Sequence, residues 1–127
     1  MTLLRERITI VGASLAGYWA AETLRRDGFE GLISLVGDEQ HEPYDRPPLS
    51  KKYLAGEVRR DQLALGDVDK LDALDLDLRL GQRATGLDVA SQLLEVNGVS
   101  ESYDGLILAT GARCRTLPST DGVMGVH

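Results

Sequence analysis

Cysteine and histidine are nearly absent from this 127-residue sequence, which contains only Cys114, His41 and His127. A single cysteine excludes an internal disulfide and a redox dithiol. The three residues are also too few and too dispersed to form a zinc or haem ligand set. We therefore predict neither thiol relay chemistry nor metal ligands in this chain.

Long apolar runs and an excess of positive charge are also missing. No stretch approaches the length that spans a membrane, and residues 1–6 carry two charges instead of an apolar leader core. The 14 lysines and arginines against 20 aspartates and glutamates give a net charge of -6. This balance argues against a nucleic acid or an anionic membrane as the partner, so we expect a soluble, cytoplasmic protein of one domain or part of one.

The first pattern that carries chemistry is a short apolar run that breaks into glycines and then into helical spacing. Ile8–Val11 is typical of a strand buried on both faces, as parallel strands are. Apolar residues then recur at helical spacing, and Asp27-Gly28 is expected to end the helix. The expected buried face of that helix consists of Leu15, Ala16, Trp19, Ala20, Thr23 and Leu24.

The turn between this strand and this helix predicts a phosphate site. Gly12 allows a sharp turn, and Gly17 lets the helix pack closely on the strand. The first N–H groups of the helix lack intrahelical partners and carry the positive end of its dipole. Ser14 replaces the second glycine of G-x-G-x-x-G, so it either crowds a pyrophosphate or turns its hydroxyl towards it, and it can also cap the helix. For this motif alone, a dinucleotide site and an ordinary glycine turn both stay open.

A second strand with acidic residues at its end favours the dinucleotide interpretation. Leu32–Val36 is apolar and β-branched, and Gly37-Asp38-Glu39 follows it. These acids stand about 20 residues beyond the last glycine, where the ribose hydroxyls of a bound dinucleotide lie. Asp38 or Glu39 is therefore the expected ribose ligand, and the alternative is a pair of acids in a polar loop.

Residues 41–56 predict a loop that is stiffened by prolines and carries cationic side chains. Pro43, Pro47 and Pro48 restrict the backbone, and Ser50 is expected to cap a short helix that ends at Gly56. Arg46 and Lys51 would lie near the glycine turn, where they suit an anionic ligand. A solvated basic loop is the alternative.

The remainder of the chain predicts one helix and several strands. Helical spacing covers residues 68–74, and alternating leucines over 74–80 indicate a half-exposed strand. Residues 87–89, 93–96 and 99–103 predict a small antiparallel meander with a hairpin at Asn97-Gly98. Leu106–Ala109 is another buried strand whose carboxyl end should lie beside the first turn. The predicted fold is α/β, a Rossmann-like parallel sheet with a small antiparallel β-meander.

Several blocks of this sequence resemble one family. They are I-V-G-A-S-L-A-G with L-V-G-D-E, P-Y-D-R-P-P-L-S-K-K-Y-L-A-G, and L-I-L-A-T-G-A-R-C-R-T-L-P. Together they are similar to the N-terminal part of the FAD-dependent ferredoxin and rubredoxin reductases, within the pyridine nucleotide-disulfide oxidoreductase superfamily. Members pass electrons from NADH through FAD to a small iron–sulfur protein that serves an oxygenase or a cytochrome P450. The resemblance implies FAD as cofactor, NADH as substrate of the full-length enzyme and a ferredoxin as partner.

The resemblance also assigns roles to matching positions. Arg46 and Lys51 correspond to cofactor contacts, and Lys51 is expected near the N5/O4 edge of the flavin, where a cation stabilises the reduced, anionic ring. Ala84 matches a position that presents its backbone to adenine, and Ala109-Thr110-Gly111 match the A-T-G that lines the FAD site. The expected cofactor-binding set is Gly12, Ala13, Ser14, Leu15, Ala16, Gly17, Asp38, Glu39, Arg46, Pro47, Lys51, Ala84, Ala109, Thr110 and Gly111. No catalytic residue is expected.

Disulfide reductases of the related fold carry a C-x4-C pair beside the flavin, and no cysteine precedes Cys114 here. The flavin is therefore expected to pass electrons on directly. Residues 1–127 are expected to be the N-terminal portion of the FAD-binding domain, inactive alone, with the NADH-binding and C-terminal domains absent. A non-catalytic FAD or nucleotide-binding module, a flavoprotein similar to apoptosis-inducing factor, and NAD in place of FAD stay open as alternatives.

Overall fold

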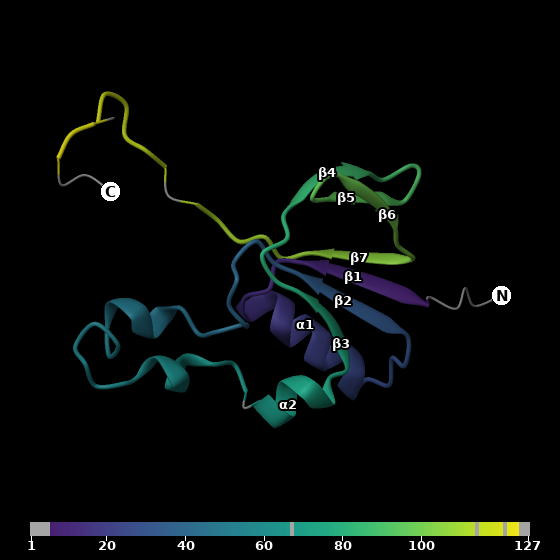
Figure 1. Cartoon of the computed structure of the whole chain (residues 1–127), viewed down its shortest axis with the longest axis horizontal. Helices are drawn as coiled ribbons and strands as arrows, with labels where there is room; N and C mark the ends of the chain where they lie inside the picture. Colours follow the sequence, from purple (N-terminus) through teal and green to yellow (C-terminus); the bar gives the residue numbers. More distant parts are fainter. Residues whose placement is uncertain (1–5, 67, 114, 121, 125–127) are drawn as a thin grey trace.

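The computed structural model describes residues 6–66, 68–113, 115–120 and 122–124. A four-stranded sheet and a three-stranded sheet organise the chain (Figure 1). The elements in chain order are β1 Arg7–Val11, α1 Leu15–Arg26, β2 Leu32–Val36, the 3-10 turns η1 Pro47–Ser50 and η2 Arg60–Leu63, α2 Val68–Ala73, β3 Leu76–Arg79, β4 Ala84–Asp88, β5 Leu93–Val96, β6 Val99–Ser102 and β7 Gly105–Leu108.

The larger sheet is parallel throughout, with the strand order β3-β2-β1-β7. Ile10 at its centre lies opposite Leu35 on one side and Ile107 on the other. The two central strands, β1 and β2, are buried from their second residue to their last because both of their faces are covered. The α/β prediction is confirmed, and so are the predicted helix and strand on either side of residue 74.

Alternate residues of β1 and β2 face two different cores. On one side Ile10, Ile33 and Leu35 pack against Ala21 of α1, and all four are completely buried. On the other side Val11 and Val36 pack against the small sheet through residues of β5 and Tyr103. Burying a side chain of this size contributes about 1.5–3 kcal/mol, so the two cores join the sheet, the helix and the small sheet into one unit.

The small sheet is the predicted antiparallel meander, in the order β4-β5-β6. Its β5–β6 hairpin turns at Asn97 and Gly98, which both have positive φ, 49° and 78°, as the Asn-Gly signal predicts. The first strand starts earlier than expected: β4 begins at Ala84, and the register shifts between Ala84 and Gly86, so that Thr85 is the extra residue on this strand.

The predicted buried face of α1 is partly wrong. Gly17, Tyr18 and Ala21 are buried, whereas Leu15 and Trp19 remain 40% and 50% exposed. Small residues let the helix approach the sheet closely, so the stripe that contains Gly17 and Ala21 faces the core. A hydropathy pattern favours the larger side chains and therefore shifts the expected face around the helix.

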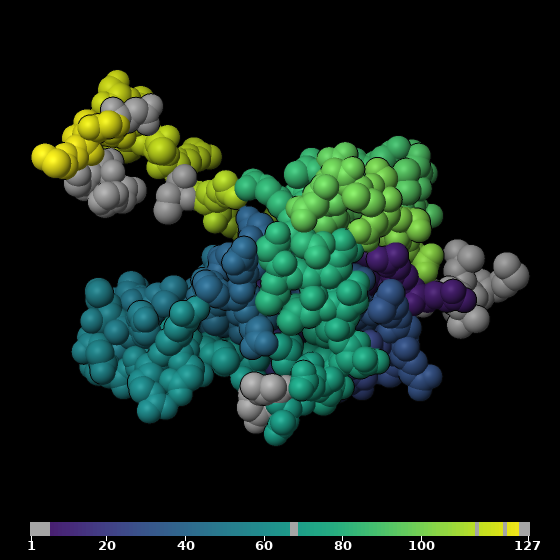
Figure 2. Space-filling view, in the orientation of Figure 1, coloured from purple at the N-terminus to yellow at the C-terminus, as the bar shows by residue number. Residues whose placement is uncertain are grey.

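The short helix predicted from Ser50 to Gly56 is also wrong. The structure has a 3-10 turn at Pro47–Ser50 and a series of further turns to residue 58. Proline at the start of a helical turn loses no hydrogen bond, so the turn begins at Pro47, and Lys51 then leaves helical geometry at φ -126°, ψ -107°. Residues 41–66, here called the arm, project from the body as a separate lobe (Figures 1 and 2).

Among the described residues, no helix has both the length and the apolar character required to cross a membrane.

Candidate functional site

Two adjoining hollows lie where β1, β2 and β7 end, and together they are called the edge pocket. The turn compartment, of about 260 Å³, is lined by Gly12, Ala13, Ser14, Gly37, Asp38, Glu39, Arg46, Ala109, Thr110, Gly111 and Ala112. The wall compartment, of about 310 Å³, is lined by Val11, Gly12, Val36, Gly37, Asp38, Gln82, Arg83, Ala84, Thr110, Gly111, Ala112 and Arg113. Segments far apart in the sequence therefore meet at one sheet edge.

Gly12 sets the shape of the first turn, because no other residue fits there. Its φ is +115°, and a Cβ on it would lie 2.0 Å from the carbonyl oxygen of Ala109. The Gly12 N–H donates to the Val36 carbonyl at 2.8 Å, and the Ala109 N–H donates to Val11 at 2.7 Å. A Cβ on Gly17 would lie 1.9 Å from the Gly12 carbonyl oxygen, so both predicted glycine roles are confirmed.

Ser14 is the residue before α1, but it does not act as a side-chain cap. Its backbone is extended, and its hydroxyl makes no capping hydrogen bond to the helix, contrary to one of the two roles predicted for it. The first turn of α1 also contains no acidic residue. The positive end of the helix dipole is thus left uncompensated beside the turn compartment, an arrangement that suits an anionic group.

Glu39 is held by two neighbours in the structure. Arg46 Nη2 lies 2.6 Å from Glu39 Oε1, and the Tyr44 hydroxyl donates to Oε2 at 2.9 Å. The Arg46 guanidinium also lies 5.4 Å from the centre of the Tyr44 ring. Burial, and then the hydrogen bond to Glu39, raises the pKa of Tyr44.

Asp38 is the freer of the two predicted ribose ligands. It lines both compartments, its side chain is 53% exposed, and its ion pair with Arg113 is long at 3.7 Å. Since both oxygens of Glu39 are already engaged, Asp38 offers the carboxylate that can accept hydrogen bonds from a ligand.

The far side of the wall compartment is formed by residues 82–84, here called the wall. The Gln82 N–H donates to the Gly37 carbonyl at 2.9 Å, and the Gly37 N–H donates to the backbone carbonyl of Arg79 at 3.0 Å. Arg83 exchanges hydrogen bonds with Asn97: its N–H donates to Oδ1 at 3.0 Å, and its carbonyl accepts from the Asn97 N–H at 2.9 Å. The wall is thereby tied to the end of β2 and to the small sheet.

Ten of the predicted cofactor-binding residues line the edge pocket. They are Gly12, Ala13, Ser14, Asp38, Glu39, Arg46, Ala84, Ala109, Thr110 and Gly111. Leu15, Ala16, Gly17, Pro47 and Lys51 do not line it. Gly17 is buried between helix and strand, and Lys51 lies exposed on the arm.

Sequence reasoning missed several residues of the pocket, among them Gly37, Gln82, Arg83 and Arg113. Gly37 gave a usable signal, because it follows a buried strand just as Gly12 does. A Cβ on it would lie 2.5 Å from the Ala13 Cβ. Gln82 and Arg83 had no such signal, since their place depends on how the small sheet packs against the larger one.

A larger hollow lies elsewhere. It measures about 1020 Å³ and is bounded by both limbs of the arm, including Tyr44, Tyr53 and Arg60, and by Leu80. It contains none of the predicted cofactor-binding residues and lies open between segments of one loop. The convergence of strand ends, a glycine turn and a helix start favours the smaller edge pocket as the functional site.

No metal-binding cluster occurs in the ranges that the structure describes, where no three histidine, cysteine, aspartate or glutamate side chains lie together.

Comparison with known proteins identifies relatives of this chain. The sequence pattern of the pyridine nucleotide-disulphide oxidoreductase family matches residues 6–127. The ferredoxin–NAD(+) reductase component of the biphenyl dioxygenase system of Paraburkholderia xenovorans is 43% identical over 124 residues, which cover 96% of this chain and 30% of that protein. Rhodocoxin reductase of Rhodococcus erythropolis is 44% identical over 122 residues, covering 94% and 29% respectively.

Solved structures agree with these matches. The crystal structure of the covalent putidaredoxin reductase–putidaredoxin complex matches with a TM-score of 0.86 and 41% identity, over 92% of this chain and 28% of the other. The chain thus spans less than a third of the length of these relatives. By sequence pattern, identity and fold, the chain belongs to the pyridine nucleotide-disulphide oxidoreductase family.

Proposed function

We propose that this chain is the FAD-binding segment of an NAD(P)H-dependent ferredoxin reductase, and that the edge pocket holds the ADP half of FAD. The observation that carries this proposal is the convergence of the Gly12 turn, Asp38, the wall and residues 109–112 in one pocket. Dinucleotides bind open α/β sheets at this place, outside the carboxyl ends of the strands.

The turn compartment suits the pyrophosphate. The uncapped start of α1 offers N–H donors and the positive end of its dipole, and the missing side chain at Gly12 lets the chain turn sharply against Ala109 at this place. Asp38 then lies at the boundary of both compartments, where it would accept hydrogen bonds from ribose hydroxyls.

The wall compartment suits the adenine ring, which would lie against the backbone of residues 83–84. Arg46, at the opposite end of the edge pocket, and Lys51 on the arm would then lie towards the flavin. Bound FAD would supply the redox chemistry, accepting electrons from a nicotinamide and passing them on singly. This chain's own residues would bind, orient and charge-balance the cofactor.

The relatives support the partner class. Two of them are named as ferredoxin or rhodocoxin reductases, and a third was solved in complex with putidaredoxin. We propose a ferredoxin or similar small iron–sulfur protein as the electron acceptor, in the cytoplasm. Oxidation of NAD(P)H would require the other parts that the longer relatives contain, so the 127 residues alone are expected to be inactive.

FAD titration of the Asp38→Asn variant tests this proposal. The substitution keeps the size of the side chain but weakens it as an acceptor for ribose hydroxyls, so we expect the dissociation constant for FAD to rise about tenfold. Flavin fluorescence quenching gives the constant, and ADP should displace FAD whereas FMN should not.

The matched control is Asp27→Asn, which changes an exposed aspartate at the other end of α1. It should leave FAD affinity unchanged. Equal affinities in both variants, or displacement by FMN but not by ADP, would contradict the assignment of the pocket.

A further inference from the structure

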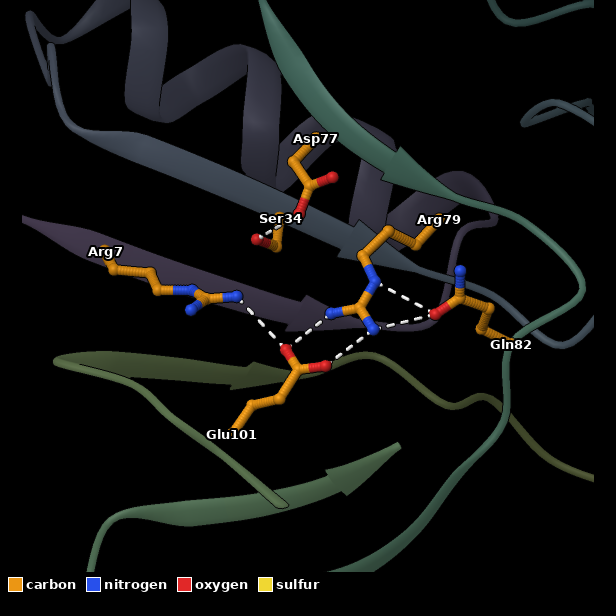
Figure 3. A network of polar contacts seen from close by, with 6 residues as sticks. All are labelled: Arg7, Ser34, Asp77, Arg79, Gln82 and Glu101. Atoms are coloured by element: carbon orange, nitrogen blue, oxygen red, sulfur yellow. Dashed lines mark hydrogen bonds and ion pairs between the residues drawn. The ribbon is translucent and has the colours of Figure 1, made fainter. Parts of the chain in front are cut away.

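A half-buried carboxylate in the small sheet is linked to the edge pocket through one arginine. Glu101 of β6 accepts two hydrogen bonds from Arg79, at 2.6 Å from Nη1 and 2.7 Å from Nη2 (Figure 3). The Glu101 and Arg79 side chains are only 22% and 17% exposed. A paired fork of this kind fixes the plane of the guanidinium as well as its position.

The same guanidinium holds the wall. Arg79 donates from Nε and Nη2 to Gln82 Oε1, at 3.0 and 2.7 Å. Gln82 is the first residue of the wall, and its own N–H donates to the Gly37 carbonyl. Figure 3 shows Arg79 between the two partners, with Glu101 on one side and Gln82 on the other.

Arg7 provides an internal comparison, because it contacts the same carboxylate but not the wall. Its Nη2 lies 3.1 Å from Glu101 Oε2, and its buried Nε has no hydrogen-bond partner. Of the two arginines that contact Glu101, only Arg79 also contacts the wall, at Gln82. An effect on the general stability of the chain would involve Arg7 as well.

We propose that Glu101 is a positioning residue for the nucleotide site: through Arg79 it fixes Gln82 and so sets the wall against Gly37. The identity of the ligand rests on the function proposed above, but the placement of the wall does not. The small sheet then has a role beyond packing, since it supplies the carboxylate that orients the wall of a pocket formed by the larger sheet.

Amide hydrogen exchange, measured by NMR on the ligand-free chain, tests the placement directly. Glu101→Gln keeps the shape but removes the charge, and Arg79→Lys keeps the charge but lacks the fork. We expect the Gln82 and Arg83 amides to exchange at least about tenfold faster in both variants, relative to Ile10 and Leu35 in the core. Arg7→Gln is the control, and it should leave the exchange rates of the Gln82 and Arg83 amides unchanged relative to those of the core amides.

The variant that combines Arg79→Met, Glu101→Leu and Arg7→Gln keeps the experiment decisive if a single variant unfolds, because all three charges of the cluster are removed together and none is left without its partner. The Gln82 and Arg83 amides should also exchange faster in this variant than in the natural chain. Unchanged exchange at Gln82 and Arg83, or acceleration equal to that of the core amides, would overturn the proposal.

ADP affinity separates this inference from the proposed function. In Glu101→Gln and Arg79→Lys we expect the dissociation constant for ADP to rise about tenfold at a temperature well below unfolding, with no change in Arg7→Gln. If the natural chain binds no ADP, the proposed function fails while the exchange experiment still decides the role of Glu101. If ADP binds and Glu101→Gln leaves its affinity unchanged, the positioning role is wrong.

Discussion

At the scale of single residues, the edge pocket depends on positions where a Cβ does not fit. Gly12 and Gly37 each approach a neighbouring segment so closely that any side chain would collide with it. The role of Gly12 was predictable, because a glycine between a buried strand and a helix has a known backbone use. The uncapped state of Ser14 was not, since Ser before a helix usually caps it.

The Gly12→Ala variant should be destabilised by about 3 kcal/mol or more in urea unfolding, because the new Cβ would collide with the Ala109 carbonyl at 2.0 Å. Gly28→Ala is the matched control. Gly28 also has a positive φ, +89°, but nothing lies within 4 Å of its Cβ position, so backbone strain alone should cost about 1–2 kcal/mol. Equal losses in the two variants would show that close approach at Gly12 is not the cause.

At the scale of elements, the sequence predicted which segments are strands better than how they meet. Period and composition identify the strands of both sheets, and Asn97-Gly98 specifies its hairpin through local backbone preference. The buried face of α1 and the shape of residues 51–56 depend on which neighbours each segment contacts. The ion pair between Arg79 of β3 and Glu101 of β6 also depends on tertiary neighbours, because the two residues come from strands that belong to different sheets.

The stability that Glu101 contributes should depend on pH. Hydrogen bonds from Arg79 hold the pKa of Glu101 below its ordinary value of about 4.3 and raise that of Arg79. A carboxylate with a lowered folded-state pKa contributes stability above its unfolded pKa and loses it as the pH falls through the folded pKa. The urea midpoint of the natural chain should therefore exceed that of Glu101→Gln at pH 7.

That difference should shrink as the pH falls from about 4.3 through the lowered pKa of the folded state. Glu95→Gln, a change in a half-buried carboxylate of the neighbouring strand that accepts a hydrogen bond from Thr85 and not from an arginine, is the control and should show a smaller difference throughout. A Glu101→Gln effect that is constant from pH 7 to pH 3 would contradict an electrostatic origin.

At the scale of the whole molecule, the chain combines a well-packed sheet with surfaces that have no partner in the described residues. The arm stands apart from the body (Figure 2), and Trp19 and Leu54 are 50% and 78% exposed. The chain also spans less than a third of its relatives. The family and the α/β fold could be predicted from local motifs. The division of the edge pocket into a turn compartment and a wall compartment could not, because it arises from how segments distant in the sequence pack.

An NMR titration of ADP into the isotope-labelled chain tests whether the edge pocket is the nucleotide site. We expect chemical-shift changes at Gly12, Ala13 and Ser14, at Asp38, in the wall and at Thr110–Arg113, all around the edge pocket. Changes centred instead on Tyr53, Arg60 and Leu63 around the larger hollow of the arm, or no changes at millimolar ADP, would contradict this assignment of the site.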